Sequence, residues 1–192
     1  QLRTPLTALR LRLEQADESI ERDPASAKPK IEAALAETER LQHLVDGLLA
    51  LARAEARDDA LEVVDVLSVV RDRITSWAAL SAESGVRLEM IGSVPCRATA
   101  MGGVLDQILD NFIDNAVQYS PAGSTIEVAV DPGSSAVVIS VSDRGPGMTA
   151  EQCERALDRF WRAPDAPAGG TGLGLAIAAR LAEASGGSVS LT

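Results

Sequence analysis

Residues 104–119 read VLDQILDNFIDNAVQY, the stretch with the clearest structural pattern in the chain. Its apolar residues recur at helical spacing, which predicts an amphipathic helix with one buried face. We expect that face to consist of Leu105, Ile108, Leu109, Phe112 and Ala116. Asn111 and Asn115 lie four residues apart and so share one side of the helix. Their amide oxygens suit Mg²⁺, although taken alone the pair is more simply two surface amides.

Strand and helix patterns surround this helix on both sides. Strands are predicted over residues 63–66, 86–91, 94–98, 125–130 and 136–142, and helices over 67–79 and 171–184. We expect a turn at residues 131–134 between the last two strands, and we expect Gly186-Gly187 to end the last helix. Pro95 limits the segment 94–98 to a strand start or a sheet edge. This order predicts an α+β fold, with helices on one face of a mixed, mainly antiparallel sheet.

Two glycine-rich segments follow the helix. Asp143-Arg144-Gly145-Pro146-Gly147 comes directly after a strand, where a carboxylate can accept a hydrogen bond from an exocyclic amine and glycines let the backbone approach a flat ring. Gly169-Gly170-Thr171-Gly172-Leu173-Gly174 opens a helix, a position that suits phosphate. The second segment is neither a Walker A loop nor a dinucleotide fingerprint. Each segment alone is also compatible with an ordinary turn.

The first 57 residues differ in character and contain one glycine, Gly47. A heptad-like seam predicts a first helix, a break follows at residues 23–29, and a second seam predicts another helix. The seams are Leu2, Leu6, Leu9 and Leu13, then Ile31, Leu35, Thr38, Leu41, Leu44, Leu48 and Leu51. A single hairpin cannot bury both faces of such a seam, so we expect a homodimeric four-helix bundle. The predicted domains are 1–57 and 62–192, with a linker at 54–60.

Composition narrows the range of partners. The net charge of −10 argues against nucleic acid as a direct partner, because phosphate backbones require clustered basic residues. Cys96 and Cys153 match no metal-binding spacing and are expected to be reduced thiols. No apolar run approaches the ~20 residues of a membrane span, and no signal peptide is visible.

The order and spacing of the motifs are more specific than any one of them. They run Asn111-x-x-x-Asn115, Asp143-x-Gly145-x-Gly147, Phe160-Trp161-Arg162 and Gly170-x-Gly172-x-Gly174. This arrangement resembles the N, first-glycine, F and second-glycine boxes of the ATP-binding domain of histidine kinases. That domain shares a superfamily with the gyrase, heat-shock chaperone and mismatch-repair ATPases.

The resemblance implies ATP and Mg²⁺ as cofactors. Asn115 would coordinate Mg²⁺ with support from Asn111, and Asp143 would accept a hydrogen bond from the adenine amine. Tyr119 would pack near the ring, and Arg162 would reach the γ-phosphate from a mobile lid over residues 147–169. The other nucleotide contacts would come from Gly145, Gly147, Gly170, Thr171, Gly172, Leu173 and Gly174. The family often has a lysine three residues after the metal-binding asparagine, where this chain has Gln118, so we expect weaker nucleotide binding.

The beginning of the chain carries a second resemblance. Residues 1–8 read QLRTPLTA and resemble the phospho-acceptor box of these kinases, His-x-Leu-Arg-Thr-Pro-Leu. The acceptor histidine is therefore expected directly before Gln1, and the box places Gln1, Arg3, Thr4 and Pro5 in the catalytic group. Pro5 would bend the helix and help to expose the acceptor, and Thr4 would help to orient water for dephosphorylation. Gln1 replaces the usual acidic residue, so slower transfer is expected.

His43 is the only histidine in the chain and lacks such a context, so we interpret it as a solvated surface residue. The resemblance implies an autokinase that passes its phosphoryl group to an aspartate of a response regulator, with a membrane sensor upstream in the full protein. A catalytically degenerate dimeric scaffold or a regulator phosphatase is the first alternative, which Gln1 and Gln118 favour. A general ATPase of the same superfamily is the second, which the phospho-acceptor box disfavours.

Overall fold

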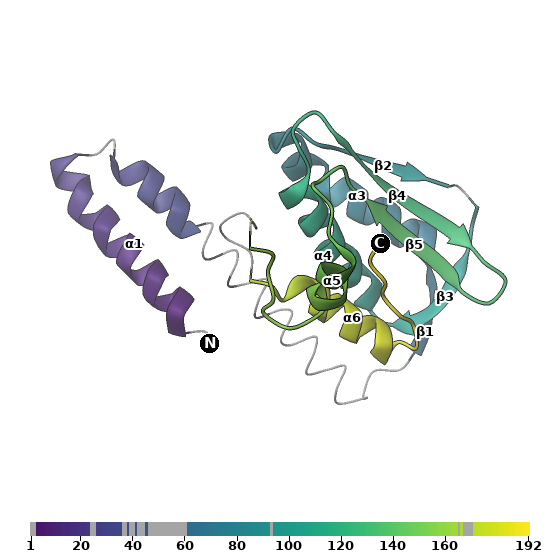
Figure 1. The fold of residues 1–192 in the computed structure, drawn as a ribbon. Helices are drawn as coiled ribbons and strands as arrows, with labels where there is room; N and C mark the ends of the chain where they lie inside the picture. The colour runs from purple at the N-terminus through teal and green to yellow at the C-terminus, as the bar shows by residue number, and fades with distance from the viewer. Residues whose placement is uncertain are drawn as a thin grey trace.

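The computed structural model describes residues 3–23, 26–35, 38, 41, 45, 61–92, 94–164, 166 and 171–192. It contains a helical part before residue 46 and an α+β part from residue 61 onward (Figure 1). The predicted linker, His43, Gln1, Gly170 and the seam residues Leu2, Leu44, Leu48 and Leu51 lie outside the described residues. Among the described residues, no helix is long and apolar enough to cross a membrane.

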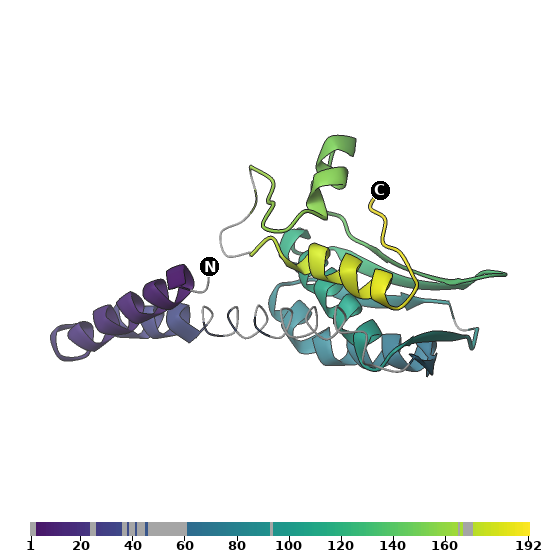
Figure 2. The same ribbon diagram turned by 90° about the horizontal axis from the view of Figure 1, so that it is seen from below.

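The helical part forms the predicted hairpin. Helix α1 spans Arg3–Arg22, and the chain is helical again over residues 26–35, which run beside α1 in both ribbon views (Figures 1 and 2). Lys30 Nζ joins the two helices by donating to Ser19 Oγ at 2.5 Å and to the Gln15 carbonyl at 3.4 Å. The break is shorter than the predicted 23–29, because Pro29 lies in the first turn of the second helix, where its missing N–H is tolerated.

Small residues pack inside the hairpin, and several larger apolar residues remain exposed. Ala16, Ala27 and Ala34 are buried, as is the seam residue Leu41, whereas the seam residues Leu13, Ile31 and Leu35 are 49%, 39% and 59% exposed. A single hairpin thus covers only part of its apolar surface, as expected if a second hairpin covers the rest.

The described residues of the α+β part form nine helices and strands. In chain order they are β1 (Leu61–Asp65), α3 (Val66–Glu83), β2 (Arg87–Ile91), β3 (Arg97–Met101), α4 (Val104–Tyr119), β4 (Thr125–Pro132), β5 (Val137–Ser142), α5 (Ala150–Ala156) and α6 (Gly174–Ala184). Strand β4 pairs in parallel with β2 and antiparallel with β5, while β1 and β3 form a separate antiparallel pair. The predicted mixed sheet and the β4–β5 pair are confirmed.

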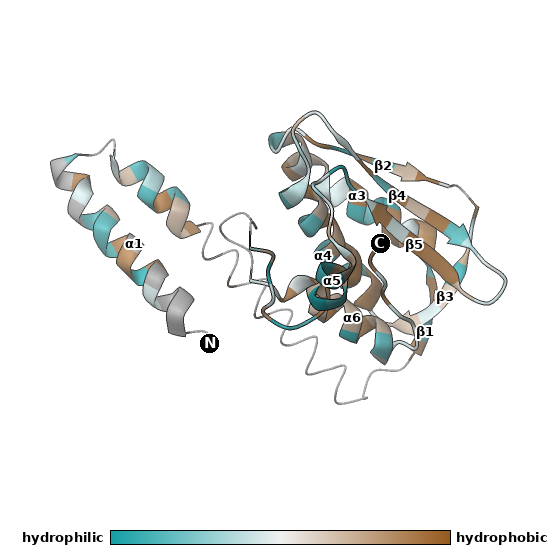
Figure 3. Cartoon of the chain, in the orientation of Figure 1, coloured by the Kyte–Doolittle hydropathy of each residue, from teal (hydrophilic) through white to brown (hydrophobic). Residues whose placement is uncertain are grey.

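The core lies between the β2-β4-β5 sheet and the helices α3 and α4. Ile126, Val128 and Val130 alternate along β4 toward this core, and β4 and β5 are largely brown in Figure 3. Helix α6 packs on α4 from another side through Leu173, Ile177 and Leu181. Of the predicted face of α4, Leu109 and Ala116 are buried, whereas Leu105, Ile108 and Phe112 are only half-buried. Because α4 is covered on more than one side, it also buries Val104 and Ile113, which the prediction did not include.

Helix α4 has the predicted bounds, but several other boundaries differ from prediction. Helix α3 continues to Glu83, where Gly85 at φ +72° ends it: the Gly85 N–H bonds to the Ala82 carbonyl and the Val86 N–H to the Ser81 carbonyl. Strand β3 lies at residues 97–101 and not 94–98, because it pairs with β1 in the register Asp65↔Arg97 to Leu61↔Met101. Helix α6 begins at residue 174 and not 171.

The predicted lid contains a helix that we did not anticipate. Helix α5 begins after Thr149, whose hydroxyl accepts from the Gln152 N–H at 3.2 Å while the Gln152 side chain accepts from the Thr149 N–H at 2.8 Å. This reciprocal pair is a capping box. In Figure 2 α5 stands away from the sheet and its helices. Both cysteines are free, as expected.

Candidate functional site

One edge of α4 meets the beginning of α6. The Asn111 side-chain amide donates to the Gln107 carbonyl at 2.8 Å. Its oxygen lies against Gly174, where a Cβ atom would come within 2.9 Å of Asn111 Oδ1. The first residue of α6 therefore has to lack a side chain for the helix start to lie this close to the asparagine.

The C-terminal end of the same helix meets the other glycine segment. A Cβ atom at Gly145 would lie 2.9 Å from the Tyr119 carbonyl oxygen. The Gly145 N–H donates to Asp143 Oδ1 at 2.7 Å, which folds the loop into a tight turn just after β5. Asp143 is exposed beside this turn, in a position to accept a hydrogen bond from a ligand.

Asn115 lies between these two contacts. Residues 111, 115 and 119 are one helical turn apart in succession and span about 12 Å along α4. The structure therefore brings two distant glycine segments to the same edge of one helix, on either side of a half-buried asparagine side chain. Such an edge suits an elongated ligand with a ring at one end and phosphates at the other.

The second glycine segment also contacts the Phe160–Arg162 segment through its backbone. The Phe160 N–H donates to the Gly172 carbonyl at 2.7 Å, and a Cβ atom at Gly172 would lie only 2.5 Å from the Trp161 carbonyl oxygen. Gly172 has φ +66°, and Phe160 has φ +68°, a strained value for a residue with a side chain. This contact places the exposed residue Arg162 beside the start of α6.

The start of α6 is suited to an anion. It lacks a side-chain N-cap, and just before it the Leu173 N–H donates to Thr171 Oγ1 at 3.3 Å. The first N–H groups of such a helix attract negative charge. Leu173 was predicted to bind nucleotide, but its side chain is only 4% exposed and packs in the core with Met101, so only its backbone can face a ligand.

The predicted site residues that the structure describes fall into three groups. The structure gathers most of them along α4 and at the start of α6: Asn111, Asn115, Tyr119, Asp143, Gly145, Arg162, Thr171, Gly172, Leu173 and Gly174. Gly147 has φ +72° and open space around it. Arg3, Thr4 and Pro5 lie in the first turn of α1, and nothing more is described of their side chains.

The donor set fits a magnesium-bound phosphate ligand. Asparagine oxygens are hard ligands of the kind Mg²⁺ accepts, and Mg²⁺ takes its other ligands from water and substrate phosphates. The uncapped start of α6 supplies N–H groups for the phosphates. Among the described residues, no cluster of histidine, cysteine and acidic side chains offers a different metal site.

Known proteins match both parts of the chain. Residues 103–192 match the family described as histidine kinase-, DNA gyrase B-, and HSP90-like ATPase, and residues 1–57 match the His Kinase A (phospho-acceptor) domain. The chain belongs to the sensor histidine kinases. The two matches cover the motifs of the ATP-binding domain and of the phospho-acceptor box, in the predicted order.

Individual histidine kinases resemble the chain over almost its whole length. It is 34% identical to the sensor histidine kinase WalK of Bacillus subtilis, over 98% of this chain and 32% of that protein. It is also 34% identical to the sensor protein QseC of Escherichia coli K12, over 97% of this chain and 41% of that protein. The solved histidine kinase AdeS of Acinetobacter baumannii superposes with a TM-score of 0.72 and 26% identity, over 95% of this chain and 85% of that one.

The chain thus spans about a third to two fifths of the curated histidine kinases WalK and QseC. What these comparisons show is the family and the two domains.

Proposed function

We propose that this chain is the catalytic core of an ATP-dependent protein-histidine autokinase in a two-component system. The observation that carries the proposal is the edge of α4, where two separate glycine segments meet Asn111 and Tyr119 on either side of Asn115. The helical hairpin with its Leu-Arg-Thr-Pro box supplies the second half of such an enzyme in the same chain.

Different residues of the site would bind the Mg²⁺ ion, the adenine ring and the phosphates of ATP. Asn115, supported by Asn111, would hold Mg²⁺, which when bound neutralises charge on the phosphates. Asp143 would accept from the adenine amine next to Tyr119, and the N–H groups at the start of α6 would bind phosphate oxygens. Arg162 would stabilise the charge that develops on the γ-phosphate.

The phospho-acceptor is proposed to be a histidine directly before Gln1. Its ring nitrogen would bond to the γ-phosphorus as the bond from phosphorus to the ADP oxygen breaks, and the ring N–H proton would pass to solvent. Gln1 would accept a hydrogen bond from the imidazole, and Arg3, Thr4 and Pro5 complete the box. The phosphoryl group would then move to a response-regulator aspartate. We further propose a homodimer, and a membrane sensor upstream.

A second candidate is a dimeric scaffold or response-regulator phosphatase without autokinase activity. Two observations favour it: Gln1 stands where the family has an acidic residue, and Gln118 stands where it often has a lysine. Both replacements remove a charge that would assist phosphoryl transfer.

Labelling with γ-³²P Mg·ATP tests the proposal. Two proteins are compared, this chain and the same chain extended at its N-terminus by its native residues. Acid-labile, base-stable label on the extended protein alone is the expected result. Absence of label on both, with ATP still bound, would favour the scaffold or phosphatase. Label on the shorter chain would identify His43 as the acceptor and contradict our interpretation of the first helix.

Gln118→Lys is expected to tighten Mg·ATP binding about fivefold, because a charge-assisted hydrogen bond is about 1 kcal/mol stronger than a neutral one. Gln118 is half-buried and is the last residue but one of α4. Isothermal titration calorimetry measures the change. Glu183→Gln on α6 is the matched control, because it shifts the net charge by the same amount on an exposed surface. Equal tightening in both variants would mean that bulk charge, not a local contact, is responsible.

A further inference from the structure

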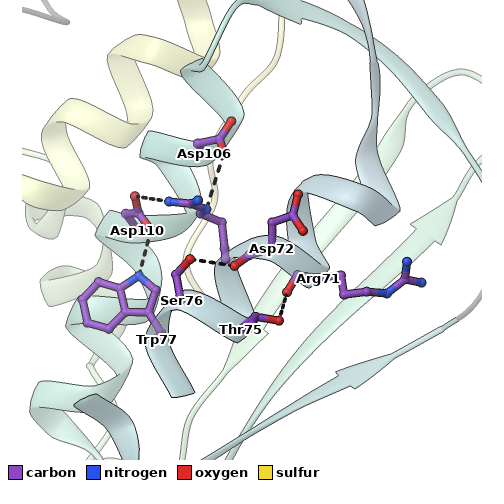
Figure 4. A network of polar contacts seen from close by, with 8 residues as sticks. Arg71, Asp72, Thr75, Ser76, Trp77, Asp106 and Asp110 are labelled. Carbon is purple, nitrogen blue, oxygen red and sulfur yellow. Dashed lines mark hydrogen bonds and ion pairs between the residues drawn. The ribbon is translucent and has the colours of Figure 1, made fainter. Parts of the chain in front are cut away.

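A polar network links α3 to α4 (Figure 4). At about 100° per residue, Asp106 and Asp110 lie on a different side of α4 from Asn111 and Asn115, whose side we call the asparagine edge. The Arg73 guanidinium lies 3.4 Å from Asp106 Oδ1 through Nε and 3.4 Å from Asp110 Oδ2 through Nη1. Trp77 Nε1 donates to Asp110 Oδ1 at 2.8 Å. Both oxygens of Asp110 are therefore engaged by residues of α3, and one arginine reaches two points a helical turn apart on α4.

Helix stability does not account for this arrangement. Asp106 lies in the first turn of α4, where a negative charge is favourable, but Asp110 lies beyond that turn. Two aspartates four residues apart repel each other in a helix. The side chains of Arg73, Asp106 and Asp110 are 27%, 38% and 37% exposed, so their ion pairs are only partly shielded from water. The network instead fixes where α4 lies relative to α3.

Geometry connects this network to the site. Asp110 directly precedes Asn111, and Asn115 is one turn further along. A side-chain atom about 5–6 Å from the helix axis moves about 1 Å when the helix rotates by about 10°. Misplacement of about 1 Å in a site can reduce a rate by about 100-fold. Contacts at both Asp106 and Asp110 oppose rotation and axial sliding together.

We propose that Arg73 and Trp77 are positioning residues that set the rotation of α4, and through it the placement of the Asn111 and Asn115 amides. This inference rests on the proposed function, because it assigns the network to the Mg·ATP site. Core packing of α4 against the sheet sets its distance from the strands, and the hydrogen bonds from Arg73 and Trp77 to Asp110 add a directional restraint that apolar contacts do not supply, while Asp106 is held by charge attraction alone.

Three variants test the network in the 192-residue chain. Trp77→Phe keeps the ring and removes the hydrogen bond to Asp110, Arg73→Met removes both ion pairs, and Arg73→Lys can restore only one. The Kd of ATP is measured by calorimetry with Mg²⁺ and with EDTA, together with the Tm. We expect Trp77→Phe and Arg73→Met to weaken Mg·ATP binding about tenfold, because changing residues that orient metal ligands usually lowers metal affinity by at least that factor. The Kd of metal-free ATP should change less than twofold. Arg73→Lys should weaken Mg·ATP binding less than Arg73→Met does.

Ser76→Ala is the matched control, because it removes a 2.9 Å hydrogen bond from the same face of α3 to its own backbone and leaves α4 untouched. Unchanged Mg·ATP affinity in Trp77→Phe and Arg73→Met would overturn the inference. An equal loss of ATP affinity with and without Mg²⁺ would also overturn it, because that pattern indicates general destabilisation. If Arg73→Met does not fold, Trp77→Phe decides alone. Failure of the unmodified chain to bind Mg·ATP would instead refute the proposed function, and the inference with it.

Discussion

Gly172→Ala is expected to weaken Mg·ATP binding by about 100-fold while leaving the fold intact, because the loss of one or two hydrogen bonds to charged phosphate oxygens costs about 3 kcal/mol. An added Cβ would lie 2.5 Å from the Trp161 carbonyl oxygen and 2.8 Å from the Phe160 carbonyl carbon. These are backbone atoms, so the Phe160–Arg162 segment or the start of α6 has to move by close to 1 Å to make room. Either shift separates Arg162 from the N–H groups that we propose bind phosphate. A fluorescent ATP analogue titrated with Mg²⁺ measures the loss.

Gly186→Ala is the matched control for this prediction. Gly186 has φ +79°, close to the +66° of Gly172, but no atom lies within 4 Å of its added Cβ. Both variants place an alanine in the left-handed conformation, which costs about 1–2 kcal/mol. Only Gly172→Ala also places its Cβ against the backbone of Phe160 and Trp161. Similar losses of ATP affinity in the two variants would show that backbone strain, and not the contact with Phe160–Arg162, is responsible.

The parts of the fold that were predicted correctly depend on local patterns. The bounds of α4 follow from apolar residues at helical spacing, and the β4–β5 pair follows from alternating residues on either side of a turn. That turn was predicted at residues 131–134 but lies at 133–136, because Asp131 and Pro132 still pair with Val138 and Val137. Gly186 was correctly expected to end α6, because the Gly187 N–H bonds to the Ala182 carbonyl in the motif that a left-handed glycine permits. These signals act within a few residues of one another.

The wrongly predicted boundaries are those that depend on contacts with residues far away in the sequence. Strand β3 is displaced from its predicted position because its register is set by β1, more than thirty residues earlier. Helix α6 starts late because Gly172 adopts a left-handed conformation in contact with Phe160. Helix α5 is the exception: Thr149 and Gln152 carry a capping-box pattern that is visible in the sequence and was overlooked.

The same distinction applies to the site. The order of the motifs predicted which residues belong together, and the structure brings Asn111 to Gly174 and Tyr119 to Gly145. Sequence could not predict that the Leu173 side chain turns into the core, since that depends on Met101 and α6. Nor could it pair Trp77 with Asp110, which are 33 residues apart and match no motif.

Ile113→Ala is expected to lower the free energy of unfolding of the α+β part by about 2–5 kcal/mol, the usual cost of removing a large aliphatic side chain from a core. Ile113 is fully buried on α4 and belongs to the same cluster as Val66, Val70 and Val128, from α3 and β4. Urea unfolding followed by tryptophan fluorescence measures the change. Both tryptophans, Trp77 and Trp161, lie in the α+β part, so the signal does not include the hairpin.

Ile113→Val should cost only about 0.5–1.5 kcal/mol, because one methyl group is lost and the remaining atoms keep their contacts. Val63→Ala is the surface control: Val63 is 67% exposed on β1, so its truncation should change stability by less than about 0.5 kcal/mol. A graded series of this kind would place α4 at the centre of the core. If Ile113→Ala costs no more than Val63→Ala, α4 is not packed as described, and the asparagine edge that depends on its placement would lose its structural basis.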